Sequence, residues 1–133
     1  MTRAAIDLRN IEAPQRAARR IVRKALAGKA GGEYTDDVVL VADELVGNAV
    51  EHAGAALDMS LDVYEWGVTV QVRDGGEDTT AVPGMPLAAD EDDEGGRGLF
   101  LVDVLASAWG VQHDEKGKRV IAIFLYRTGD ADQ

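Results

Sequence analysis

The segment DELVGNAVEHAG, residues 43–54, constrains the fold of this chain more than any other stretch. It lies within residues 35–53, where apolar residues recur at helical spacing and predict a long helix. Glu44, Asn48 and His52 follow one another at intervals of four, so they advance slowly along one face of that helix, beside its apolar stripe. The pattern predicts a polar seam at the edge of the core. A solvent-facing row that contains a satisfied histidine is the simpler alternative.

Length and composition indicate one domain. The chain has 133 residues, of which 46% are hydrophobic, enough for a single core but too few for two domains. It contains no cysteine, which excludes disulfides and thiolate metal sites. No stretch is long and apolar enough to cross a membrane, and the first residues do not have the pattern of a signal peptide. We therefore expect one domain over residues 1–133, a cytoplasmic location and no membrane partner.

The charge argues against nucleic acid as a partner. The formal net charge is −10, and the resulting field repels a phosphate backbone. The charge is also uneven, because residues 1–30 hold eight basic and two acidic residues, whereas the remainder is strongly acidic. This polarity suggests that different faces meet different partners. Residues 16–24 are a candidate docking surface, although a solvated helix face is the commoner explanation of such a run.

Hydrophobic periodicity predicts alternating helices and strands along the chain. Thr35 or Asp36 is the expected N-cap of the central helix. Residues 75–96 show no sustained periodicity, so we expect a long lid there. The expected elements are a strand over 3–9, helices over 12–28, 35–53 and 97–108, a β-hairpin over 56–74 that turns at 65–67, and a second hairpin over 109–127 that turns at 115–118.

Asp74 is expected to point into the core. It has the same strand parity as Val68, Val70 and Val72, which alternate toward one face. A buried carboxylate needs a hydrogen-bond or charge partner. An Asp-Gly pair after a strand is most often only a turn, but turn residues do not usually belong to the core face.

The sequence GGRGL, residues 95–99, opens the helix that follows the expected lid. The free N–H groups and the dipole of a helix N-terminus attract anions, and glycines allow a phosphate to approach the backbone. A flexible hinge is the alternative. The segment is neither a P-loop nor a dinucleotide fingerprint, because G-x-x-x-x-G-K-[ST] and G-x-G-x-x-G are both absent.

Taken together and in this order, the three features resemble a known superfamily. A helix with E-x-x-x-N-x-x-x-H, a hairpin that ends in D-x-G, an irregular lid and G-G-x-G-L resemble the N, G1 and G2 boxes of the GHKL, or Bergerat-fold, ATPases. The segments ELVGNAVEHA and GGRGLFLVDVLASAWGV look most like those of the anti-sigma-factor serine-protein kinases, and the resemblance extends over residues 11–125. The resemblance implies a two-layer α/β sandwich, in which three helices cover one face of a mixed, mostly antiparallel sheet.

The resemblance also implies roles for individual residues. Glu44 matches the general base, Asn48 the Mg²⁺ ligand at the nucleotide, and Asp74 the acceptor for the adenine amino group, while His52 is left as a structural residue. ATP and Mg²⁺ are the implied cofactors. The other implied nucleotide-binding residues are Gly76, which leaves room for the base, and Gly95, Gly96, Arg97, Gly98 and Leu99, which match the phosphate cradle.

Some positions depart from the family pattern. Asp78 stands where the fuller G1 box has glycine, and Arg119 is offered where many relatives place a threonine beside the adenine aspartate. The acid-rich lid also lies close to the expected position of the polyphosphate. We therefore expect nucleotide affinity, rather than the fold, to differ from that of relatives.

The function that the resemblance implies is regulation of transcription. Such a protein is a Mg·ATP-dependent serine kinase that sequesters a sigma factor, phosphorylates an anti-anti-sigma protein of the STAS type and forms a homodimer. The alternative is a non-catalytic module that keeps the fold and acts by docking alone. Glu44 together with Asn48 favours the enzyme, because a docking module needs no base. An α/β domain without a ligand would leave Asp74 and the long loop unexplained.

Overall fold

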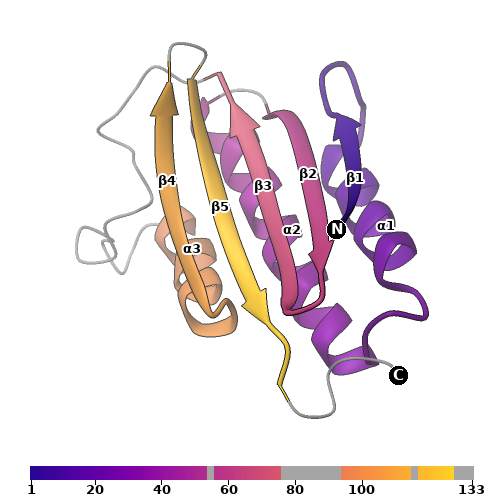
Figure 1. The fold of residues 1–133 in the computed structure, drawn as a ribbon. Helices are drawn as coiled ribbons and strands as arrows, with labels where there is room; N and C mark the ends of the chain where they lie inside the picture. The colour runs from indigo at the N-terminus through magenta and orange to yellow at the C-terminus, as the bar shows by residue number, and fades with distance from the viewer. Residues whose placement is uncertain (54–55, 76–93, 115–116, 128–133) are drawn as a thin grey trace.

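The computed structural model describes residues 1–53, 56–75, 94–114 and 117–127, without the side chains of 52, 53, 94–99 and 114. The described chain forms two layers, a five-stranded sheet and three helices that all lie behind one of its faces (Figure 1). The implied two-layer α/β sandwich is thereby confirmed. No described helix is long and apolar enough to cross a membrane.

The sheet is antiparallel at each of its four pairings. The strand order is β1-β2-β3-β5-β4, so the two hairpins meet along the β3 and β5 pairing in the middle of the sheet. The strands are β1 (Thr2–Asp7), β2 (Ala56–Tyr64), β3 (Gly67–Asp74), β4 (Ala108–Asp114) and β5 (Gly117–Leu125). Both expected hairpins are confirmed, and no parallel pairing occurs among the described strands.

The helices are α1 (Pro14–Leu26), α2 (Gly32–Ala53) and α3 (Glu94–Leu105). The expected start of α2 at Thr35 or Asp36 is wrong, because the helix already begins at Gly32. The N–H of Thr35 donates to the carbonyl oxygen of Gly31 at 2.9 Å, so Thr35 already lies within the first turn. Buried Tyr34 anchors this turn to the sheet, since its hydroxyl donates to the Phe124 carbonyl oxygen at 2.6 Å.

The core lies between the sheet and α2. The alternation of β3 places Val68, Val70 and Val72 on the covered face, where they are almost fully buried, and β5 contributes Ala122 and Phe124 in the same way. The buried side chains of α2 repeat at helical spacing, as the sequence predicts: Val38, Val41, Ala42, Leu45, Val46 and Ala49. Burial of this stripe against the valines is what positions α2 over the centre of the sheet.

No described helix covers the opposite face of the sheet (Figure 1). One aspartate on it is nonetheless buried, because Arg3 covers it. Nε and Nη2 of Arg3 donate to the two carboxylate oxygens of Asp62 at 2.7 and 3.0 Å, so the pair bridges β1 and β2. This bidentate contact raises the pKa of the Arg3 guanidinium.

Candidate functional site

The C-terminal half of α2 carries the expected polar seam. Glu44 and Asn48 are half-buried, while the neighbouring Leu45 and Ala49 belong to the core. A purely solvent-facing row would be exposed, so the structure favours a seam at the edge of the core for these two residues. The side chain of His52 lies outside the described residues.

The surroundings of Glu44 make its carboxylate a stronger base than that of an ordinary glutamate. Burial raises the pKa of its carboxyl group above the ordinary value, and the nearby charges of Asp43 and Glu51 raise it further. Asp43 is itself held by Arg19 and Gln15 of α1, which fixes its charge on the side of α2 that faces α1. A carboxylate of raised pKa accepts a proton more readily than an ordinary glutamate.

The raised pKa predicts a gain in stability when Glu44 is replaced with glutamine. Folding favours the protonated form of such a group, so the ionised form that dominates at neutral pH costs stability. This cost is absent below the unfolded-state pKa and develops as the pH rises through the folded-state pKa. Calorimetric melting temperatures of Glu44→Gln should exceed those of the wild type at about pH 7 to 8 and converge with them toward about pH 4. A variant that melts at or below the wild-type temperature at neutral pH would contradict the raised pKa.

Asn48 presents a buried amide that has an unsatisfied atom. Its Nδ2 atom is buried and makes no hydrogen bond within the described part of the chain. Buried polar atoms are normally paired, so an unpaired amide beside Glu44 is suited to a ligand that is bound from outside the chain. The described residues contain no group of three acidic or histidine side chains arranged for a metal. A cation here would have one or two oxygen ligands from the protein, which fits Mg²⁺ bound together with phosphates and water.

Asp74 points into the covered face, as its parity predicts, and its exposed fraction is 2%. Its charge partner is Lys118 at the start of β5, whose Nζ atom lies 3.7 Å from Oδ2. The sequence prediction that Arg119 stands beside this aspartate is wrong. Strand alternation directs Arg119 to the open face of the sheet and Lys118 to the covered face.

Asp74 and the seam of α2 lie at the same end of the sheet. The chain passes from the end of α2 at Ala53 into β2 at Ala56, and Ala56 is the register partner of Asp74 (Figure 1). The third element, α3, packs against α2. The structure therefore brings together the end of α2, the end of β3 and the start of β5.

The glycine-rich segment forms the first turns of α3. The helix begins at Glu94, so Gly95, Gly96, Arg97, Gly98 and Leu99 are helical, but their side chains lie outside the description. Gly76, Asp78 and most of the expected lid also lie outside the described residues, as does the tail after residue 127. Because α3 ends just before β4 begins, at the end of the sheet away from Asp74, the N-terminus of α3 is directed toward the end at which Asp74 lies (Figure 1).

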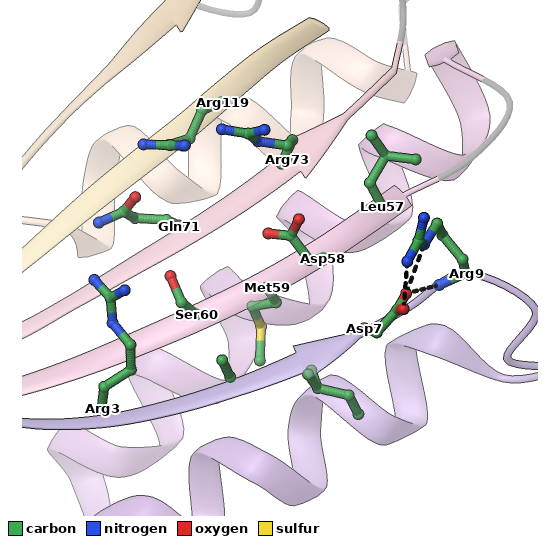
Figure 2. A pocket seen from close by; sticks show the side chains of 12 residues that line it. Arg3, Asp7, Arg9, Leu57, Asp58, Met59, Ser60, Gln71, Arg73 and Arg119 are labelled. Carbon is green, nitrogen blue, oxygen red and sulfur yellow. Dashed lines mark hydrogen bonds and ion pairs between the residues drawn. The ribbon is translucent and has the colours of Figure 1, made fainter. Parts of the chain in front are cut away.

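A shallow cavity of about 590 Å³ lies elsewhere, on the open face of the sheet (Figure 2). The side chains of Arg73 and Arg119 lie side by side in it on neighbouring strands, with Asp58 beyond Arg73. No described side chain of α2 or α3 lines this cavity. Because it offers neither Glu44 nor Asn48, we place the candidate site on the covered face and treat the cavity as a separate surface.

Sequence reasoning missed Lys118, and a signal for it was present. Lys118, Val120, Ala122 and Phe124 share one parity along β5, and all four are buried. Applying the alternation used for Asp74 to this strand would have placed a lysine on the covered face. A lysine at the end of an apolar row is typical of an exposed strand end, so the pattern alone does not predict its burial.

Comparison with known proteins identifies the domain type. Residues 9–124 match the model of the family described as histidine kinase-like ATPase domain. None of the curated proteins compared with the chain matches it. The structure of the RsbU and RsbW domains of Rv1364c from Mycobacterium tuberculosis superposes with a TM-score of 0.69 at 22% identity, over 96% of this chain and 33% of that one. The SiaB–SiaC complex from Pseudomonas aeruginosa gives a TM-score of 0.63 at 17% identity, over 91% of this chain and 89% of the other. At these identities the two likenesses establish the fold.

Proposed function

Because this chain belongs to the histidine kinase-like ATPase domain family, we propose that it is a cytoplasmic, Mg·ATP-dependent serine-protein kinase and anti-sigma factor. It sequesters a sigma factor and phosphorylates an anti-anti-sigma protein of the STAS type, and so regulates transcription. The observation that carries the proposal is the pair of Glu44 and Asn48, a half-buried base one helical turn from an amide whose buried Nδ2 atom has no hydrogen-bond partner among the described residues. The SiaB structure, which is a complex with the protein SiaC, supports docking of a partner protein on this fold.

In this proposal the nucleotide lies between α2, α3 and the ends of β3 and β5. Asp74 accepts a hydrogen bond from the exocyclic amino group of adenine, and Gly76 leaves room for the base. The free N–H groups of Gly95, Gly96 and Arg97 hold the phosphates at the N-terminus of α3, and Gly98 and Leu99 complete the same glycine-rich segment in the next turn. Asn48 would hold Mg²⁺ through its amide oxygen, and the bound ion would supply neutralisation of the phosphate charge.

Glu44 acts as the general base of the transfer. The hydroxyl oxygen of the substrate serine attacks the γ-phosphorus as the bond to the β,γ-bridging oxygen breaks, and ADP leaves with those electrons. The hydroxyl proton passes to the Glu44 carboxylate. The raised pKa of Glu44 supports this role, because a stronger base accepts the proton of a weakly acidic alcohol more effectively.

Calorimetric titration with ATP, with and without Mg²⁺, tests the proposal. We expect saturable binding that Mg²⁺ strengthens, because Asn48 supplies only one neutral ligand and the phosphates must share the ion. A STAS-domain protein incubated with the chain and Mg·ATP should then gain one phosphate on a serine, as measured by intact mass. Absence of binding at millimolar ATP would contradict the proposal and favour the docking module.

We extend the proposal to a homodimer, with the open face of the sheet as the contact surface. The register aligns Asp7, Asp58, Arg73 and Arg119 in one row across β1, β2, β3 and β5, two acids followed by two bases, with Asp7 also paired with Arg9 of its own chain. A twofold axis parallel to the strands would set the acids of one copy opposite the arginines of the other. Sedimentation equilibrium should report the mass of a dimer, and a monomer at every concentration would contradict this contact.

A further inference from the structure

Lys118 is a buried cation whose position the fold determines closely. It is the only buried basic side chain among the described residues, with an exposed fraction of 6%. Burial of an ammonium group is costly unless a partner compensates the charge. Asp74 supplies that charge at 3.7 Å, and both groups lie on the covered face of the sheet.

Gly117, the first residue of β5, keeps Lys118 in register with Asp74. The two residues are direct partners in the pairing of β3 with β5. Gly117 precedes Lys118 with φ of 132°, a conformation that favours glycine, and a Cβ at Gly117 would lie 2.0 Å from the Asp74 carbonyl oxygen. The backbones of the two strand ends are thus in close contact. A shift of β5 that moved Lys118 out of register with Asp74 would have to break this contact.

The pair offers two different hydrogen-bonding groups to a ligand. A carboxylate accepts hydrogen bonds only, and an ammonium group donates three and accepts none. At 3.7 Å the contact is electrostatic rather than a hydrogen bond. Neighbouring polar atoms on the edge of a planar base need partners that lie a few ångström apart, which this spacing satisfies. The chemistry therefore fits a base edge on which a donor stands next to an acceptor.

We propose that Lys118 reads the nucleotide base together with Asp74, the ammonium group donating to N1 of adenine while the carboxylate accepts from the adjacent amino group. This inference rests on the proposed nucleotide site. It assigns Lys118 as a specificity-determining residue, because hypoxanthine and guanine present the reverse order, an acceptor where adenine has the amino group and a donor at N1. In those bases like groups would face each other at both positions, and buried polar groups would remain unpaired.

An ATP analogue that carries carbon in place of N1, 1-deaza-ATP, tests the contact on the unmodified protein. We expect the wild type to bind 1-deaza-ATP about tenfold or more weakly than ATP, since a hydrogen bond to a charged donor is lost. Equal affinity for the two nucleotides would overturn the inference and leave the proposed function standing. Failure to bind either nucleotide would overturn both.

The variant Lys118→Met removes the donor from the protein. Combined with the loss of N1 from the nucleotide, it forms a double-mutant cycle. It should bind ATP and 1-deaza-ATP with equal affinity, because the analogue then lacks nothing that the protein can use. Arg119→Met is the matched control, since it removes a cation from the next residue but from the opposite face of the sheet. It should keep the wild-type ratio of the two affinities. A Lys118→Met protein that keeps that ratio would assign the N1 contact to another group and overturn the inference.

Discussion

Replacing Glu44 with glutamine should lower phosphoryl transfer to the serine of an anti-anti-sigma substrate by about 10² to 10⁴-fold, the usual contribution of a general base. Glutamine keeps the size of the side chain but cannot take the hydroxyl proton. Binding of Mg·ATP should remain nearly unchanged, because the base is proposed to contact the attacking hydroxyl rather than the nucleotide. Single-turnover transfer of radiolabelled phosphate and calorimetric titration measure the two quantities separately.

The matched control for this experiment is Glu33→Gln. Glu33 is an exposed acid in the first turn of the same helix, far along α2 from Asn48. Its replacement should leave transfer at the wild-type rate. If Glu44→Gln also transferred phosphate at that rate, another group would be the base. The gain in melting temperature expected for Glu44→Gln would show in the same preparation that the variant is folded.

Asp74→Asn should weaken ATP binding by about 100-fold. The substitution removes the charged acceptor that the adenine amino group requires and adds a donor at a position that faces one. It also leaves the buried ammonium group of Lys118 without its counterion, so the variant should melt at a lower temperature than the wild type. Titration at a temperature where circular dichroism shows a folded protein separates the loss of binding from the loss of stability.

Asp62→Asn is the control for this second prediction. Asp62 is also a buried aspartate that is paired with a cation, Arg3, but it lies on the open face of the sheet. Its replacement should cost stability without weakening ATP binding. Equal ATP affinities for wild type and Asp74→Asn would place the base elsewhere. Equal losses in both variants would indicate a general effect on the fold.

Much of the fold follows from local patterns, with a few informative exceptions. The valines of β3 alternate without interruption, so both the strand and the inward direction of Asp74 were predictable. The start of α2 was not, because Tyr34 anchors the first turn through a contact with Phe124, which is 90 residues distant in the sequence. Helix-capping preferences describe local chemistry and carry no information on such a contact.

The candidate site, like the fold, could be predicted from the sequence only in part. The seam of Glu44 and Asn48 was predictable, because both its spacing and the apolar stripe beside it belong to one helix. The partner of Asp74 was not identified, since which residue faces it depends on the register of β3 with β5. A shift of one residue in that register would place Arg119 opposite Asp74 and move Lys118 to the open face.

By itself, the sequence determined the order of the elements, the apolar faces that form the core and the polar residues of α2, because each depends on the periodicity of one segment. Only the tertiary structure decided that Lys118 faces Asp74, that Arg3 covers Asp62, and that Arg73 and Arg119 share the open face. The physical reason is that these pairs join strands distant in the sequence, whose relative register is set by packing and backbone pairing across the whole sheet.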